Sequence, residues 1–173
     1  MSKSRDFIAL DLALLTISDT RTASDDKSGA TLRELVTAAG HRVAEQTIVP
    51  DDIYAIRAIV SRWIADPDVR AVITTGGTGL TGRDGTPEAV TPLLDKTIDG
   101  FGEMFRVISY DIIGTSTLQS RTIAGVANGT FIFCLPGSSG ACKDGWSKLI
   151  SHQLDYRTRP CNLVELMPRV LEK

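Results

Sequence analysis

The sequence predicts an α/β fold, a three-layer α/β/α sandwich around a mostly parallel sheet that includes an antiparallel hairpin. Short apolar runs of strand length alternate with helical segments, and the runs are almost continuously apolar, as in parallel strands buried on both faces. Asn128 and Gly129 separate two further apolar runs and indicate the hairpin. We expect one domain over residues 1–173, with its core at about 8–154 and a partly mobile tail at 155–173.

In the first half of the chain, apolar runs predict strands over residues 8–18, 41–49 and 70–75. The polar stretch 19–29 predicts a loop. The helix expected over 31–39 ends at Gly40, since glycine readily adopts the conformation that terminates a helix. A second helix is expected over 53–64, where apolar residues recur at helical spacing.

In the second half, Thr86 is expected to cap a helix that has Pro87 in its first position. A further helix is expected over 100–113, and a Thr/Ser-rich loop over 115–120. The hairpin strands are expected over residues 123–127 and 130–135. The last helix starts within the segment 135–150.

Composition and charge argue against several classes of protein. The chain has 19 basic and 21 acidic residues, a net charge of −2, so it lacks the basic excess that attracts nucleic acid. No apolar run approaches the roughly 20 residues of a membrane span, and Asp6 and Asp11 interrupt the segment where a signal peptide would be apolar. The cysteines, Cys134, Cys142 and Cys161, form no metal-binding motif. We expect a cytoplasmic protein with reduced thiols and with no nucleic-acid or membrane partner.

Four segments follow the carboxyl ends of expected strands, where sheets of this kind bind ligands: residues 18–20, 50–52, 75–84 and 136–139. The loop TTGGTGLTG offers backbone N–H groups and threonine hydroxyls to an anion, although no GK[ST] follows it. The loop PGSSGA offers a second set of N–H groups. Together they predict a polyphosphate site or two anion sites, while tight strand-to-helix turns remain the alternative.

Two aspartates, Asp51 and Asp84, lie in these segments. A carboxylate beside a phosphate is repulsive unless a cation lies between them, so this placement predicts Mg²⁺. Spacing also allows Asp51 to cap the helix that begins near Ile53, and allows Asp84 to be an acidic loop residue beside the Thr86 cap.

Other polar residues are less specific. Arg83 and Arg121 either stabilise charge on a transferring phosphoryl group or form surface or subunit ion pairs. No nucleophile and base are paired in the sequence, and His41 and His152 are expected at the surface. The stretch GFGEMFRVI belongs to the core or to a subunit interface, with its phenylalanines in the core.

Six motifs occur in this order: ISDT, IVPDD, TTGGTGLTGRDGTPEAV, GFGEMFRVIS, LQSRTIAGV and LPGSSGA. With them the chain, from about residue 8 to about residue 154, resembles the MoaB/MogA family of molybdenum cofactor biosynthesis proteins, which includes the G domain of gephyrin. GFGEMFR, GTSTLQSR and RTRPCN are particularly similar to the bacterial MoaB branch. The resemblance implies the fold of that family and assembly as trimers or hexamers.

The activity that the resemblance implies is transfer of AMP from Mg-ATP to molybdopterin, which gives adenylylated molybdopterin and pyrophosphate. It implies Asp51 and Asp84 as the catalytic and Mg²⁺-positioning groups. The substrate- and nucleotide-binding residues that it implies are Thr75, Gly76, Gly77, Thr78, Gly79, Ser109, Ser120, Arg121, Pro136, Gly137, Ser138 and Ser139. Partners would be molybdopterin, ATP, further copies of the chain and other proteins of molybdenum cofactor biosynthesis.

The chain departs from the family pattern at Gly85, where the family commonly has valine. We expect this glycine to loosen the turn that carries Asp84. Two other functions stay open: an oligomeric scaffold that binds molybdopterin or nucleotide without turnover, and a nucleotide hydrolase. The hydrolase is disfavoured because the glycine loop lacks the lysine of a Walker loop.

Overall fold

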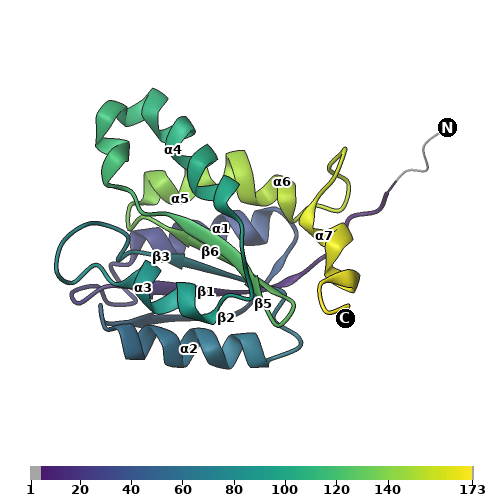
Figure 1. Cartoon of the computed structure of the whole chain (residues 1–173), viewed down its shortest axis with the longest axis horizontal. Coiled ribbons are helices and arrows are strands. Elements are labelled where there is room, and N and C mark those ends of the chain that lie inside the picture. Colours follow the sequence, from purple (N-terminus) through teal and green to yellow (C-terminus); the bar gives the residue numbers. More distant parts are fainter. Residues whose placement is uncertain (1–4, 173) are drawn as a thin grey trace.

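The computed structural model describes residues 5–172, and within them one mixed sheet forms the centre of the molecule (Figure 1). Its strand order is β2-β1-β3-β6-β5-β4. The strands are β1 (Asp11–Ile17), β2 (Arg42–Val49), β3 (Ala71–Thr75), β4 (Lys96–Thr97), β5 (Ile123–Ala127) and β6 (Thr130–Leu135). The first four in the spatial order are parallel, whereas β5 runs antiparallel to both β6 and β4. The predicted fold class is therefore confirmed.

Helices cover both faces of this sheet (Figure 1). They are α1 (Lys27–Ala38), α2 (Ile53–Ala65), α3 (Thr86–Val90), α4 (Asp99–Ile113), α5 (Ser139–Gly145), α6 (Ser151–Gln153) and α7 (Leu163–Leu166). Alternate residues of β1 supply the two cores: Leu12 and Leu14 pack with α1, α4 and α5, and Ala13 and Leu15 pack with α2 and α3. This alternation explains the continuous apolar runs, because both faces of each central strand are buried.

The hairpin has the predicted bounds on both strands. Asn128 and Gly129 have φ values of +46° and +84°, which asparagine and glycine tolerate in a two-residue hairpin turn. The sequence did not predict β4, because its two residues are exposed and carry no apolar pattern. Lys96 and Thr97 become a strand only by pairing with the outer edge of β5.

Two predicted helix starts are wrong. The helix expected from residue 31 begins at Lys27, because the Asp26 carboxylate accepts the Gly29 N–H at 2.9 Å and so caps it within the presumed loop. Thr86 does not cap α3; Gly85 precedes the helix, and Thr86 Oγ1 donates to the Gly76 carbonyl at 2.8 Å. The same hydroxyl therefore links α3 to the glycine loop. The loop expected over residues 115–120 lies mostly within a 3₁₀ helix that spans residues 114–119.

The C-terminal tail, for which we expected partial mobility, packs against the core in the structure. Asn162 caps α7 by accepting the Glu165 N–H at 3.0 Å. Val164 and Met167 are buried in the core that faces α1 and α5. Glu165 also forms an ion pair with Arg5, which joins the two ends of the described chain. The sequence did not predict this packing, because the segments of the tail are short and lack strong periodicity.

His41 is buried, contrary to the expectation of a surface residue, whereas His152 is exposed as expected. The His41 ring packs against the rings of Phe7 and Trp146, and its Nδ1 accepts the Leu10 N–H at 3.1 Å. Burial lowers the pKa of His41, an effect that the nearby Asp155 carboxylate opposes and Arg42 reinforces. Burial therefore favours the neutral ring, whose Nδ1 accepts the hydrogen bond from Leu10.

This burial predicts a loss of stability in mild acid. The unfolded chain takes up a proton at His41 near its ordinary pKa of about 6.5, whereas the folded chain resists protonation until the pH is lower. The free energy of unfolding should be insensitive to His41 above that pH and should decline as the pH falls below it. Urea unfolding from about pH 8 to about pH 5 measures the decline.

The control is His41→Asn, whose Oδ1 can accept the Leu10 N–H but does not titrate. Carboxylates that titrate in acid are common to both proteins, so the difference between the two curves isolates His41. Identical pH dependence in the two proteins would contradict this account.

Candidate functional site

The site lies at the point in the sheet where the order of successive strands reverses. The chain passes from β1 to β2 on one side and then to β3 on the other side of β1, so the connections after β1 and β3 diverge. Ligands bind at such switch points, beyond the carboxyl ends of the strands. The four segments that we expected there do follow parallel strands, which end at Ile17, Val49, Thr75 and Leu135.

A cavity of about 670 Å³ lies at this position. Twelve of the predicted site residues line it: Asp51, Asp84, Thr75, Gly76, Gly77, Thr78, Gly79, Ser109, Ser120, Pro136, Gly137 and Ser138. The other two, Arg121 and Ser139, are not among the residues that line it. The structure thus brings together two glycine loops, two aspartates and two serines that lie far apart in the sequence.

The cavity also has lining residues that the sequence did not identify. Thr16, Ile17, Ser18, Thr20 and Arg21 come from β1 and the loop after it, and Phe105, Ile112, Ile113, Ser116, Gln119, Gly140, Ala141 and Asp144 come from helical segments. Ser18 and Thr20 lie in a segment already expected at a strand end, so topology could have found them. The residues from α4 could not be found in this way, because that helix reaches the cavity through packing rather than by following a strand.

The first glycine loop needs glycine for two different reasons. Gly76 and Gly77 have φ values of +108° and +66°, a backbone conformation that side chains disfavour. Gly77 and Gly79 also leave room for carboxylates: a Cβ on Gly77 would lie 3.2 Å from Asp51 Oδ1, and one on Gly79 would lie 2.7 Å from Asp84 Oδ2. The loop backbone therefore contacts both aspartates directly.

Asp51 does not cap a helix, so that alternative is wrong. Asp52 caps α2 instead, accepting the N–H groups of Tyr54 and Ala55 at 2.9 and 2.8 Å. Asp51 Oδ2 accepts the Asp19 N–H at 3.0 Å, and Asp19 Oδ1 accepts the Asp51 N–H at 3.0 Å. Burial raises the pKa of Asp51, and the negative charges of Asp19 and Asp84 raise it further. Its surroundings therefore favour a positive charge nearby.

Asp84 is held differently. Its Oδ2 accepts the hydroxyl and the N–H of Thr81 at 2.6 and 2.8 Å. These bonds, the hydroxyl bond foremost, hold the pKa of Asp84 below its usual value. The two aspartates thus have pKa values displaced in opposite directions, a pattern that often marks functional carboxylates.

Both arginines form ion pairs, as one of the two open interpretations expected. Arg83 pairs with Asp19 at 2.7 and 2.8 Å. Arg121 pairs with Glu88, and it also donates to the carbonyl oxygens of Gly79 at 2.7 Å and Asp84 at 2.9 Å. Arg121 therefore stabilises the glycine loop by its contacts with the loop backbone.

The donors at the cavity suit a hard cation such as Mg²⁺. Within residues 5–172, no three or more His, Cys, Asp or Glu side chains are grouped so as to hold a metal ion. Mg²⁺ does not require such a group, since it commonly binds one or two carboxylates together with water and phosphate oxygens. Asp51 and Asp84 fit that requirement. None of the three cysteines is paired in the described structure, and burial raises the pKa of Cys134 to about 12 and of Cys142 to about 11.

Gly85 fills a confined position next to Asp84. Its φ of −125° is open to any residue, but a Cβ there would lie 3.0 Å from Ile53 Cγ1. A larger residue at position 85 therefore requires Ile53 to shift. The absence of a side chain at Gly85 thus allows the Asp84 turn to pack closely against Ile53 at the start of α2.

Comparisons with known proteins agree in family and fold. The family model described as "Probable molybdopterin binding domain" matches residues 13–156. Molybdenum cofactor biosynthesis protein B of Escherichia coli (strain K12) is 55% identical over 159 residues, which cover 92% of this chain and 94% of that protein. A crystal structure of molybdenum cofactor biosynthesis protein B has a TM-score of 0.84 and 47% identity, covering 87% of this chain and 94% of the other.

A more distant solved structure is the tungsten cofactor synthesizing protein MoaB from Pyrococcus furiosus, with a TM-score of 0.73 and 35% identity. The match covers 83% of this chain and 92% of that one. None of the described helices is both long and apolar enough to cross a membrane.

Proposed function

The chain belongs to the MoaB/MogA family of molybdenum cofactor biosynthesis proteins, and on this premise we propose that it binds molybdopterin and transfers AMP to it from Mg-ATP. The observation that carries the proposal is the placement of Asp51 and Asp84 in one cavity with two glycine loops. This arrangement combines groups suited to phosphates with groups suited to the cation that accompanies them.

The reaction is an in-line exchange at phosphorus. A terminal phosphate oxygen of molybdopterin forms a bond to the α-phosphorus of ATP, the bond from that phosphorus to the β-phosphate bridging oxygen breaks, and pyrophosphate leaves. Mg²⁺, when bound, neutralises charge on the phosphates. The chain itself contributes positioning: the N–H groups of Gly77 and Thr78 bind phosphate oxygens, and Asp51 and Asp84 fix the place of the cation.

The remaining walls suit the organic part of a substrate. Ser109 and Ser120 supply hydroxyls on the α4 side of the cavity, and Phe105, Ile112 and Ile113 supply apolar surface. A heterocycle such as a pterin needs both, since its rings pack against apolar groups while its edge forms hydrogen bonds. The volume is typical of small-molecule sites, which measure roughly 300–1,000 Å³.

The test is to incubate the protein with molybdopterin and Mg-ATP and to measure adenylylated pterin and pyrophosphate. Equal amounts of the two products support the proposal. Molybdopterin binding without product would instead identify a scaffold. Nucleotide hydrolysis without pterin would identify a hydrolase, a function that the absence of lysine from the described lining residues disfavours.

We also propose that the chain self-associates through the outer face of α4 and the 3₁₀ helix after it. Phe101 and Phe105 bury one side of α4, whereas Val107, Tyr110 and Leu118 are 61%, 58% and 76% exposed. Several large apolar side chains exposed on neighbouring segments are typical of an interface. The family resemblance favours a trimer or a hexamer. Association with other proteins of the pathway and a cytoplasmic location both stay predictions.

Replacing Val107 by Asp is expected to weaken this association, because it places a charge among the exposed apolar side chains of α4. Light scattering over a range of protein concentrations measures the mass. The control is Tyr54→Asp, a similar change at a residue of α2 that is 75% exposed, which should leave the mass unchanged. A monomeric wild-type protein, or equal effects of both variants, would count against this interface.

A further inference from the structure

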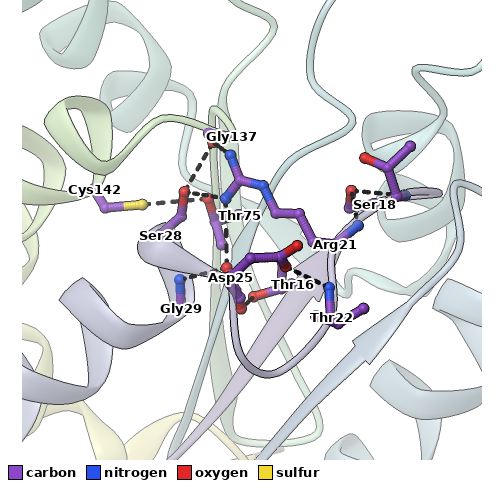
Figure 2. Close-up of polar contacts among 12 residues, drawn as sticks. Thr16, Ser18, Arg21, Thr22, Asp25, Ser28, Gly29, Thr75, Gly137 and Cys142 are labelled. Carbon is purple, nitrogen blue, oxygen red and sulfur yellow. Dashed lines mark hydrogen bonds and ion pairs between the residues drawn. The ribbon is translucent and has the colours of Figure 1, made fainter.

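Arg21 is the one basic residue among the described residues that line the cavity. It lies in the loop between β1 and α1, and its guanidinium extends toward Ser28 and Gly137 (Figure 2). Arg21 Nη1 donates to Ser28 Oγ at 2.6 Å, and Nη2 donates to the Gly137 carbonyl at 2.9 Å. One side chain thus connects its own loop, the first turn of α1 and the second glycine loop.

The first turn of α1 provides a fixed base for this contact. Asp26, whose side chain is 4% exposed, accepts Thr16 Oγ1 at 2.5 Å and the Gly29 N–H at 2.9 Å. Arg21 Nη1 lies 3.4 Å from Asp26 Oδ1, so the guanidinium is held by a buried carboxylate as well as by Ser28. Its position is therefore determined by α1 and β1 rather than by the ligand.

The acceptor in the second loop is held by two donors. The Gly137 carbonyl accepts Ser28 Oγ at 2.8 Å in addition to Arg21 (Figure 2). The C=O and N–H of a trans peptide point in opposite directions. Directing the Gly137 carbonyl toward Arg21 therefore directs the Ser138 N–H away from it. The two donors fix the orientation of this peptide group.

The second glycine loop in turn lies directly against the first. A Cβ on Gly137 would lie 3.3 Å from Gly76 Cα, so the two backbones touch at this point. Thr75 Oγ1 also donates to the Pro136 carbonyl at 2.9 Å. A displacement of Gly137 consequently changes the support of Gly76.

We propose that Arg21 is a positioning residue that acts through the Gly137 carbonyl, holding the second glycine loop against the first so that both form one binding surface for a polyphosphate. The nature of the ligand rests on the proposed function, whereas the contact between the loops does not. A lysine at position 21 has a compact ammonium in place of the planar fork, so it cannot hold Ser28 and Gly137 in the same way.

Amide hydrogen exchange of the protein without ligand tests the contact. Arg21→Ala should increase exchange in residues 137–141 and 75–79, while Arg21→Lys should have a smaller effect. Arg33→Ala is the control, because Arg33 is an exposed arginine of α1 that contacts Gln46 and does not line the cavity. Unchanged exchange in both loops of Arg21→Ala would overturn the proposal.

Calorimetric binding of Mg-ATP then tests the consequence. Arg21→Ala should weaken binding by about tenfold or more, the loss typical for a hydrogen bond from a charged group. Ser28→Ala removes the other donor to Gly137, so the double variant should show non-additive losses if both residues act through that carbonyl. Additive losses with unchanged exchange would mean that Arg21 binds the nucleotide directly, and would also overturn the proposal.

The two experiments separate this inference from the proposed function. A wild-type protein that binds no Mg-ATP would contradict the proposed function. The exchange measurement decides the role of Arg21 in either case, because it needs no ligand.

Discussion

Replacing Asp51 by Asn is expected to reduce adenylylation of molybdopterin by about 100-fold or more, which is typical for loss of one group that stabilises transition-state charge. The amide is nearly isosteric and can still accept the Asp19 N–H that now bonds Asp51 Oδ2. It loses the negative charge that, in the proposed function, fixes the place of Mg²⁺ between the protein and the phosphates. The measurement is the rate of pyrophosphate release at several Mg²⁺ concentrations.

Asp52→Asn is a closely matched control. It makes the same change one residue away, at a side chain that caps α2 and does not line the cavity. Asparagine caps helices about as well as aspartate, so stability should be kept. Activity close to that of the wild-type protein is expected for this variant.

The dependence of activity on Mg²⁺ concentration tests whether the negative charge of Asp51 holds the cation. Higher Mg²⁺ should restore part of the activity of Asp51→Asn if that residue holds the cation, and Asp84→Asn should behave in the same way. Equal activity of the Asp51→Asn and Asp52→Asn variants would argue against a role for Asp51 in the reaction.

Strong periodic or turn patterns made most of the fold predictable from the sequence. The hairpin around Asn128 and Gly129 was found with its bounds, because its turn residues and apolar strands point to the same structure. Features that depend on contacts between distant segments were not found. β4 exists only as a partner of β5, and the tail meets the core through long-range contacts that include the packing of Val164 and Met167.

Side chains with two plausible partners account for the errors near the site. Thr86 fits the pattern of an N-cap, yet in three dimensions its hydroxyl donates to Gly76. Asp51 and Asp52 are equally good caps by spacing, and only the path of the chain after β2 decides that Asp52 takes this role. No sequence pattern indicated a role for Arg21, because its acceptor Gly137 lies more than a hundred residues away in the chain.

Gly76→Ala is expected to destabilise the fold and to abolish ligand binding. Its φ of +108° is costly for any residue with a Cβ, and that Cβ would lie 2.2 Å from the Ile17 carbonyl oxygen. Neither the β1 backbone nor the loop can yield easily, because Gly76 N–H donates to the Leu135 carbonyl at 3.0 Å and Thr86 Oγ1 donates to the Gly76 carbonyl. Backbone strain alone costs about 1–3 kcal/mol, and the steric overlap adds to it.

Gly82→Ala in the same loop separates this strain from a general effect of losing glycine. A Cβ on Gly82 would have no heavy atom within 4 Å, and its φ does not lie in the left-handed region. This change should leave stability unchanged or raise it by up to about 1 kcal/mol, because alanine restricts the unfolded chain. Urea unfolding at one fixed protein concentration measures both variants, since association would shift the midpoint. If Gly76→Ala unfolds at the same urea concentration as Gly82→Ala, the close approach of β1 and the glycine loop does not constrain residue 76, and the loop is not pre-shaped for phosphate by that contact.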